Sequence, residues 1–470
     1  MKILFVTSET YPYMKTGGLA DVAYALPGAL RAIGVDARIL MPGYPAVLDG
    51  LPGPKIVAAL KDLPGQAGPA RLFLGEAPND VPVYAIDCPG LFARPGNPYI
   101  APDGSDWPDN YRRFGALGRV GASFPGDWQP DVIHAHDWQA GLAIAYPALE
   151  RPRDRPATVF TIHNIAFQGR CSPAFMGELR LPPHTWSVDG VEFYGAVSFL
   201  KAGLFYADRI TTVSPTYAAE IQTPMGGWGL DGLLFHRRND LVGILNGVDT
   251  DIWDPESDPH VPVRYNAYSL GAKAANKAAL RAELGLAETS GPLCVAVSRL
   301  SEQKGLDLVL NSLGALRSRG GQLAVLGSGE WWLEDGFRGA AAANPQNVAV
   351  RLGYDEVFAH RLQGGGDAIL VPSRFEPCGL TQMYGLRYGT LPIVRHTGGL
   401  ADTVQDWRTG FVFGAPTPLD MATAFHRASD AFYNPGHWHW MQQQAMAEDV
   451  SWKASAERYL ALYRELRPNP

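Results

Sequence analysis

The hexapeptide TGGLAD occurs twice in this sequence, at residues 16–21 within YMKTGGLADVAYAL and at residues 397–402 within VRHTGGLADTVQDW. Each copy follows an apolar run and precedes a helix-compatible segment, so each is predicted to be a turn between a strand and a helix. Paired glycines let a backbone approach a ligand closely, and free N–H groups at a helix N-terminus bind an anion or a hydroxyl. A tight packing turn would explain either copy alone. Lys15, directly before the first copy, favours a functional role there, whereas His396 precedes the second.

Two series of strand-like and helical segments follow one another along the rest of the sequence. Short apolar runs alternate with helical stretches, and most are apolar on both faces, as in strands of a buried parallel sheet. They occupy residues 2–8, 37–43, 81–87, 131–137, 158–164, 209–214 and 241–247, then 293–300, 322–329, 347–354, 368–375, 391–397 and 409–415. The pattern predicts an α/β fold of two Rossmann-like, doubly wound domains that face each other across a deep cleft, with ligand between the carboxyl ends of both sheets.

The predicted domain boundary follows from a break in this rhythm. Strand signals stop between residues 249 and 277, where Pro, Asp and Asn concentrate. We therefore predict an N-terminal domain over residues 1–246, a C-terminal domain over 247–455 and a final helix over 456–470.

Composition excludes several classes of protein. The 470 residues are 46% hydrophobic and 19% charged, which is typical of a globular chain with two or three cores. No apolar run is long enough to span a membrane, and the start resembles a strand rather than a signal peptide. Four widely separated cysteines predict a reducing cytoplasm without a disulfide framework or zinc site. A net charge of −7 predicts no general affinity for nucleic acid, so an anionic substrate would need a local basic cluster.

Several motifs suggest other chemistry without completing it. The GxxxxGK[ST] phosphate loop is absent, and the glycine-rich run at residues 327–332 ends in Trp332 where a dinucleotide fingerprint needs glycine. His134, His136 and Asp137 have the spacing of metal ligands, but the further partners of a hydrolase site are missing. The DxD sequence at residues 249–251 is better explained as a turn and helix cap.

The strongest cluster lies in the second half. Arg299 ends a strand and Lys304 follows in the same loop, which places two cations where sheet packing needs none. The stretch SRFEPCGLTQ at residues 373–382 joins a strand to a helix, so backbone N–H groups at residues 379–381 would be free to bind phosphate. Glu376 stands just before that helix start, where a carboxylate can bind sugar hydroxyls or face a developing cation.

These motifs together form a recognisable set. KTGGLADV, HAHDW, TIHNIAFQG, LNGVDTDIWDP, SRLSEQKG, GYDE, SRFEPCGLTQMYGLRYGT and RHTGGLADTV occur in this order. The chain resembles the bacterial glycogen synthases and plastid starch synthases over essentially its whole length. Members of that family transfer glucose from ADP-glucose to an α-1,4-glucan with retention of configuration. The resemblance implies a GT-B fold, no metal, no cofactor, and a C-terminal helix that crosses back to the N-terminal domain.

The resemblance also implies roles for individual residues. The catalytic set is Glu376, His163, Arg299, Lys304 and Lys15. The donor-binding set is Lys15, Gly18, Asn246, Arg299, Lys304, Tyr354, Cys378, Gly379, Leu380 and Thr381, with Tyr354 beside the adenine. The acceptor or sugar side comprises Asp21, Asp137, Trp138, His163 and Asn164. Many transferases of this architecture carry a second glutamate eight residues after the first, but position 384 is tyrosine here, so that residue's roles do not transfer.

Three functions compete at this stage. The first is the glucan synthase, with ADP-glucose and an α-1,4-glucan as its partners and neither nucleic acid nor membrane. The second is a metal-dependent hydrolase that uses His134, His136 and Asp137. The third is a non-catalytic glucan-binding protein, because 12 Trp and 19 Tyr offer many faces for sugar stacking. A basic diphosphate site argues against the third. Composition does not separate ADP-glucose from UDP-glucose, and it does not show whether His163 acts through its ring or its carbonyl.

Overall fold

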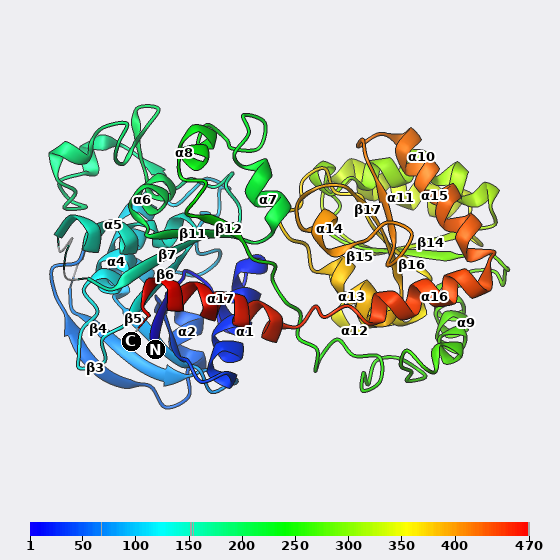
Figure 1. The fold of residues 1–470 in the computed structure, drawn as a ribbon, viewed down its shortest axis with the longest axis horizontal. Coiled ribbons are helices and arrows are strands. Elements are labelled where there is room, and N and C mark those ends of the chain that lie inside the picture. The colour runs from blue at the N-terminus through cyan, green and yellow to red at the C-terminus, as the bar shows by residue number, and fades with distance from the viewer. Residues whose placement is uncertain (67, 151–152, 154, 469–470) are drawn as a thin grey trace. The chain divides into compact units, whose positions relative to one another are not determined.

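The computed structural model describes residues 1–66, 68–150, 153 and 155–468. By contacts the chain forms two compact units. The first comprises residues 1–213, 218–244 and 452–470, and the second comprises residues 214–217 and 245–451. Each unit is built around one main sheet (Figure 1).

The first unit contains a nine-stranded sheet in the order β12-β11-β7-β6-β1-β2-β5-β4-β3. Seven strands run parallel and coincide with the predicted runs: β1 (Lys2–Val6), β2 (Asp36–Pro42), β5 (Pro82–Asp87), β6 (Val132–His136), β7 (Ala157–Ile162), β11 (Arg209–Thr212) and β12 (Leu241–Gly243). The antiparallel edge strands β3 (Lys55–Leu60) and β4 (Ala70–Glu76) were not predicted. They lie at the edge, where β3 is mostly exposed, so the sequence lacks the continuous apolar run of a buried strand there.

Helices and a small second sheet complete this unit. The helices are α1 (Gly18–Ala32), α2 (Pro45–Gly50), α3 (Pro89–Phe92), α4 (Asn110–Ala122), α5 (Gly141–Glu150), α6 (Phe199–Tyr206) and α8 (Asp231–His236). The small antiparallel sheet joins β8 (Arg170–Cys171), β9 (Glu192–Phe193) and β10 (Ala196–Ser198). Residues 214–217, which group with the second unit, are Ser214 and the first three residues of α7 (Pro215–Glu220).

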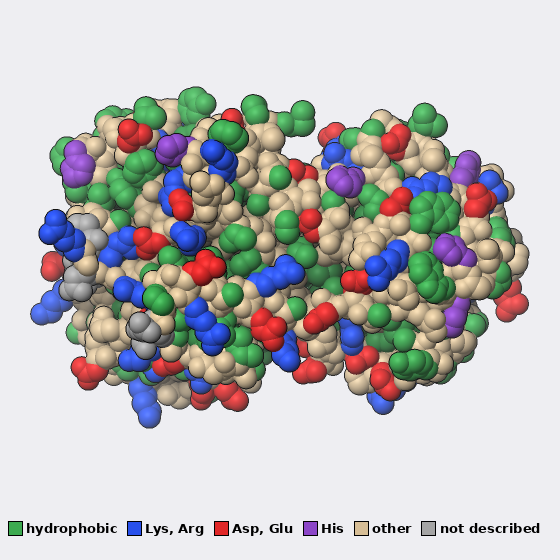
Figure 2. Space-filling view, viewed as in Figure 1, with side chains coloured by type: hydrophobic (Ala, Val, Ile, Leu, Met, Phe, Trp, Pro, Cys, Tyr) green, Lys and Arg blue, Asp and Glu red, His purple; other side chains and the backbone are tan. Residues whose placement is uncertain are grey.

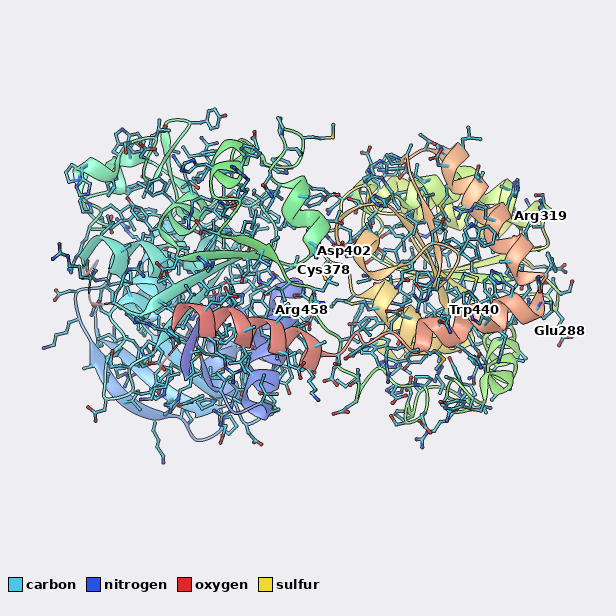
Figure 3. All side chains as sticks on the ribbon, viewed as in Figure 1. Glu288, Arg319, Cys378, Asp402, Trp440 and Arg458 are labelled. Atoms are coloured by element: carbon cyan, nitrogen blue, oxygen red, sulfur yellow. The ribbon has the colours of Figure 1, made fainter. Side chains whose placement is uncertain are left out.

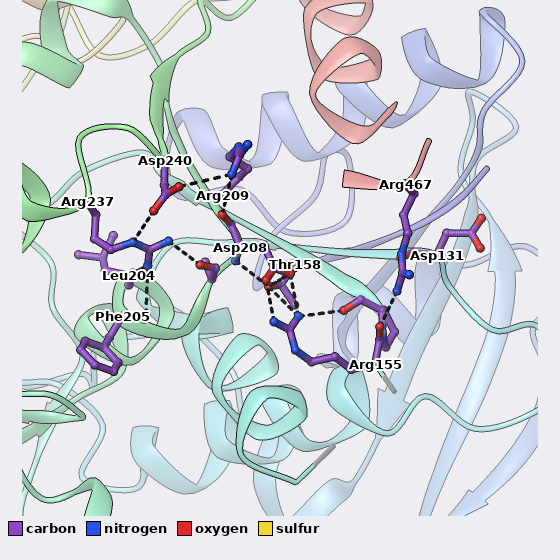
Figure 4. Close-up of polar contacts among 12 residues, drawn as sticks. Asp131, Arg155, Thr158, Leu204, Phe205, Asp208, Arg209, Arg237, Asp240 and Arg467 are labelled. Carbon is purple, nitrogen blue, oxygen red and sulfur yellow. Dashed lines mark hydrogen bonds and ion pairs between the residues drawn. The ribbon is translucent and has the colours of Figure 1, made fainter. Parts of the chain in front are cut away.

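The C-terminal helix α17 (Trp452–Leu466) belongs to the first unit and packs against α1 (Figure 1). Tyr459 and Tyr463 are buried there. After the helix, Arg467 donates hydrogen bonds to the carbonyls of Asp131 and Arg155, and Arg155 pairs with Asp208 at 2.6 Å (Figure 4). The end of the chain is therefore tied into the first unit by apolar packing and hydrogen bonds.

The second unit contains a six-stranded parallel sheet in the order β15-β14-β13-β16-β17-β18. The strands are β13 (Leu293–Val297), β14 (Gln322–Gly327), β15 (Val348–Leu352), β16 (Ala368–Val371), β17 (Leu391–Arg395) and β18 (Phe411–Phe413). Its helices are α9 (Lys273–Leu284), α10 (Leu306–Ser318), α11 (Trp331–Ala343), α12 (Glu356–Gly365), α13 (Thr381–Tyr388), α14 (Gly398–Thr403), α15 (Pro418–Phe432) and α16 (Pro435–Met446). In chain order the strands run 3-2-1-4-5-6, the Rossmann order, which confirms the predicted fold class.

The strand order also locates the candidate sites. In the first unit the order reverses between β1 and β6, and in the second between β13 and β16. Ligands of doubly wound sheets bind outside the carboxyl ends of strands at such points. Residues 7–17 and 137 follow the first pair, and the loops at 298–305 and 372–380 follow the second.

Helix apolarity and surface charge bear on membrane and nucleic-acid binding. None of the described helices combines the length and apolarity that crossing a membrane requires. On the face shown in Figure 2, acidic and basic side chains are interspersed over both units. That mixture does not form the basic stripe that marks a nucleic-acid surface.

Candidate active site

A lysine and a glutamate form the centre of the site in the second unit. Lys304 Nζ lies 2.6 Å from Glu376 Oε2, and Ser373 Oγ donates a hydrogen bond of 2.8 Å to the same oxygen. The Glu376 side chain is 9% exposed and that of Lys304 20%, so the pair is largely withdrawn from solvent. The structure thus brings together Lys304, from the loop after β13, and Glu376, from the loop after β16.

Beside this pair begins helix α13. Its N-cap residue, Leu380, makes no side-chain capping bond, so the first N–H groups of the helix are not satisfied by a local side chain. Gly379 has φ +74, and a Cβ there would lie 2.6 Å from Gln382 Oε1 and 3.1 Å from Glu376 Cγ. Only glycine fits this turn. A small cavity of about 50 Å³ lies here, lined by residues that include Ser298, Lys304, Ser373, Glu376, Gly379 and Thr381.

The second TGGLAD copy supports this loop from behind. A Cβ on Gly398 would lie 1.9 Å from the carbonyl oxygen of Glu376, and one on Gly399 would lie 2.3 Å from that of Cys378. The Gly399 N–H donates to the carbonyls of Glu376 and Pro377. Figure 3 shows Cys378 on this loop beside Asp402 of α14. In this unit the paired glycines contact protein backbone, so the second copy positions the loop that carries Glu376.

The other predicted donor residues of the second unit lie around the same edge. Arg299 is exposed, and its side chain makes no hydrogen bond or ion pair to any described residue. Tyr354, just after β15, is 77% exposed. Asn246 is buried, and its Oδ1 atom has no hydrogen-bond partner within the described chain. Burial raises the pKa of the Cys378 thiol to about 12, so this cysteine is present as the neutral thiol.

The first TGGLAD copy has different surroundings. Helix α1 begins at Gly18, and residues 7–17 separate it from β1, so this copy does not follow the strand directly as predicted. A Cβ added to Gly17 or Gly18 would meet nothing within 4 Å. These two glycines therefore face open space. Lys15 Nζ lies 2.8 Å from Asp21 Oδ1, and both side chains are partly exposed.

Sequence reasoning missed Glu9, which organises this turn. Glu9 is 2% exposed, yet both of its carboxylate oxygens accept hydrogen bonds. The backbone N–H of Thr16 donates to Oε2, while the hydroxyls of Thr16 and Tyr99 donate to Oε1. Glu9 therefore fixes Thr16, which lies between Lys15 and Gly17. A lone carboxylate after a strand gives no sequence signal for this role, because Tyr99 is distant in the chain.

Residues of HAHDW and TIHN meet at the carboxyl ends of β6 and β7. Asp137 Oδ1 accepts the backbone N–H groups of His163 at 2.7 Å and Asn164 at 3.3 Å. Burial raises the pKa of Asp137 to about 7, against the lowering effect of those two hydrogen bonds. Asp137 has φ 55 and ψ −178, a strained conformation of the kind that clusters at functional sites. Trp138 packs edge-on against Phe114, at 4.9 Å between ring centroids.

The histidines of HAHDW do not form a metal centre. His134 Nδ1 is 2.7 Å from Tyr463 Oη and His134 Nε2 is 2.6 Å from Thr161 Oγ1, so neither nitrogen is open to an ion. His136 Nδ1 lies 2.9 Å from His163 Nε2. Among the residues that the structure describes, no group of three or more His, Cys, Asp or Glu side chains is arranged to hold a metal.

Two other sequence features also have structural explanations. Asp249 Oδ1 accepts the N–H of Asp251 at 3.0 Å, so the DxD motif is a turn. Tyr384, where many related transferases carry a second glutamate, stacks on Trp253 with 3.8 Å between ring centroids.

Comparisons with known proteins identify the family. Residues 2–236 match the model described as "Starch synthase catalytic domain", and residues 277–430 match "Glycosyl transferases group 1". A glycogen synthase of Paramagnetospirillum magneticum is 49% identical over 100% of this chain and 98% of its own length. Glycogen synthase 2 of Bradyrhizobium diazoefficiens is 50% identical over 99% of this chain and 98% of its own length.

Solved structures agree with these sequence matches. The catalytic domain of starch synthase IV from Arabidopsis thaliana superposes with a TM-score of 0.86 at 32% identity, covering 99% of both chains. A sucrose-phosphate synthase from Thermosynechococcus elongatus, at 17% identity and a TM-score of 0.61, shares the fold. The chain therefore has the GT-B fold and belongs to the glycogen synthase and starch synthase family of glucosyltransferases.

Proposed function

We propose that this protein transfers glucose from ADP-glucose to the non-reducing end of an α-1,4-glucan, with retention of configuration. The observation that carries this proposal is the Lys304–Glu376 pair beside the uncapped start of α13. A cation, a carboxylate and unsatisfied backbone N–H groups are gathered at one sheet edge, as cleavage of a sugar diphosphate requires. The glycogen synthase relatives, and the Arabidopsis starch synthase structure bound to ADP and acarbose, support it.

The proposed chemistry on the second unit concerns the leaving group. Breaking the glucose–phosphate bond produces an oxocarbenium-like sugar and a diphosphate whose negative charge grows. Arg299, Lys304 and the N–H groups of residues 379–381 would stabilise that charge, and Glu376 would stabilise the sugar. For retention in one step, the acceptor 4-hydroxyl approaches the face that ADP leaves and gives its proton to the departing phosphate oxygen. Tyr354 would flank the adenine, and Asn246 would offer its free Oδ1 to the donor.

The first unit would supply the remaining contacts. Lys15 and Gly18 would bind the donor, while Asp21, Asp137, Trp138, His163 and Asn164 would face the sugars. We propose that the donor docks mainly on the second unit and that closure then adds Lys15 and His163. Closure would exclude water, which otherwise competes with the glucan for the glucose. We also propose that the reaction takes place in the cytoplasm.

Donor choice is the first test. We expect the purified protein to release nucleotide from ADP-glucose in the presence of glycogen far faster than from UDP-glucose, and to do so in EDTA. Equal or faster use of UDP-glucose would refute the donor assignment but not the assignment as a glucosyltransferase. Loss of transfer in EDTA would revive a metal-dependent mechanism.

Glu9 offers a second test, because its carboxylate accepts hydrogen bonds from Thr16 of the turn and from Tyr99. Glu9→Ala should lower turnover by about tenfold or more, since Thr16 loses its hydrogen-bond partner. Glu9→Gln should stay within about threefold of the parent enzyme. Its amide oxygen can accept the Thr16 N–H, and its NH₂ can donate to the two hydroxyls, which then act as acceptors. Values of kcat and KM for ADP-glucose measure the effect.

A matched control separates positioning from stability. Asp258 is also a fully buried carboxylate, bonded to His360 and Tyr388 in the second unit. Asp258→Ala should lower the melting temperature without the loss of turnover expected for Glu9→Ala. Equal inactivation of Glu9→Gln and Glu9→Ala would show that the charge of Glu9, rather than its hydrogen bonds, is what matters.

A further inference from the structure

The second histidine of HAHDW contacts a predicted catalytic residue. His136 is fully buried, and its Nδ1 atom lies 2.9 Å from His163 Nε2. Its other nitrogen, Nε2, is also buried and has no hydrogen-bond partner among the described residues. His163, by contrast, is partly exposed at the carboxyl end of β7.

Hydrogen-bond accounting decides which nitrogen of each ring carries the proton. A neutral imidazole has one N–H donor and one acceptor nitrogen. If the His136 proton were on Nε2, a buried N–H would have no acceptor, which is rare and costly in folded proteins. With the proton on Nδ1, His136 donates a hydrogen bond to His163 Nε2. Its own Nε2 atom then carries only an unused lone pair. His163 then accepts through Nε2 and must carry its own proton on Nδ1.

The surroundings keep both rings neutral. His136 is stacked on Phe5, with 5.4 Å between ring centroids, and lies 4.2 Å from the ring of His134. Burial lowers the pKa of His136 well below its usual range and that of His163 to about 3. Neither ring is therefore an imidazolium at neutral pH.

We infer that His136 is a positioning residue that fixes the tautomer of His163, so that the His163 ring presents a neutral Nδ1–H donor and has no free nitrogen lone pair. No described residue accepts from His163 Nδ1. The ligand that fits it is an acceptor oxygen of a sugar, and this identification rests on the proposed function. His163 cannot act as a general base through its ring, because its only lone pair is occupied by His136.

The tautomer is measured directly by long-range ¹H–¹⁵N correlation spectra of the ¹⁵N-histidine-labelled protein, with signals assigned by substitution. The pattern expected for His163 is that of an Nδ1–H, neutral ring. In His136→Leu this pattern should be lost or averaged. An Nε2–H pattern for His163 in the parent protein would overturn the inference.

Kinetics provide the second readout. The amide NH₂ of an asparagine occupies nearly the place of a histidine Nδ1–H, so His136→Asn should keep turnover within about threefold, while His136→Leu loses tenfold or more. Equal losses in the two variants would also overturn the inference. His134→Asn is the matched control, because it replaces a neighbouring buried histidine and keeps both residues of the His136–His163 hydrogen bond. It should leave the His163 signals unchanged.

The tautomer assignment and the proposed function can be refuted separately. If the parent protein transfers no glucose from any nucleotide sugar but His163 shows the Nδ1–H pattern, the proposed function is wrong and the tautomer assignment holds.

Discussion

Replacement of Lys304 by alanine is expected to lower turnover with ADP-glucose by about 10² or more while the protein remains folded. Lys304 lies 2.6 Å from Glu376 and lines the cavity beside the start of α13. The positive charge of Lys304 would stabilise the negative charge that grows on the diphosphate in the transition state. Because that charge is smaller in the bound substrate, the loss should fall mainly on kcat. Steady-state kinetics at saturating glycogen measure it.

Two further variants make this result specific. Lys277 forms an equally short ion pair, 2.6 Å from Asp367, with both side chains similarly buried in the same unit. Lys277→Ala should therefore cost stability without a comparable loss of kcat. Arg299→Ala should lower kcat as Lys304→Ala does, although Arg299 has no ion-pair partner among the described residues. If Lys304→Ala loses no more activity than Lys277→Ala, leaving-group stabilisation by Lys304 is wrong.

The parallel sheets were predictable because burial on both faces leaves a local signature. All six strands of the second unit and seven of the first coincide with continuous apolar runs. The edge strands β3 and β4 lack that signature. Residues 55–59 are mostly exposed, and the strand is defined by its antiparallel pairing with β4 rather than by its own composition.

The two TGGLAD copies have the same sequence but different structural surroundings, which the sequence alone did not reveal. Gly17 and Gly18 face open space, whereas Gly398 and Gly399 touch the backbone of Glu376 and Cys378. A sequence motif encodes backbone freedom, and the tertiary neighbours decide whether a ligand or another loop uses it. The loop around Glu376 was recognisable locally. Its support by a segment some twenty residues further on was not.

The buried polar residues around the site were hardest to predict. Glu9 depends on Tyr99, and His136 depends on His163, so each acquires its role through a contact distant in sequence. The spacing of His134 and His136 matches that of metal ligands, and the sequence does not show that Tyr463 and Thr161 occupy both nitrogens of His134. Ligand spacing constrains distance along the chain but not which atoms remain free.

The replacement of Lys15 by alanine is expected to cut turnover by about 10² and to leave ADP affinity within about threefold of the parent value. Lys15 belongs to the first unit, whereas Arg299, Lys304 and Glu376 belong to the second. In this structure the Lys15 ammonium is 2.8 Å from Asp21 and partly exposed, so it is already held by a carboxylate of its own motif. On the proposed order of events it reaches the donor only on closure. Kinetics and calorimetric titration with ADP, done on the same preparations, measure the two effects.

The comparison of affinity with turnover is what tests closure. A contact that forms only in the closed state stabilises the transition state without strengthening the initial docking of ADP, so the two quantities should separate. Lys55→Ala, at an exposed lysine on the edge strand β3, controls for the loss of one surface charge and should change neither. Asp21→Asn removes the partner that holds Lys15 in this structure and should not raise ADP affinity by more than about threefold. If ADP affinity instead collapses together with turnover in Lys15→Ala, Lys15 already binds the nucleotide at docking, and donor binding and closure are not separate steps.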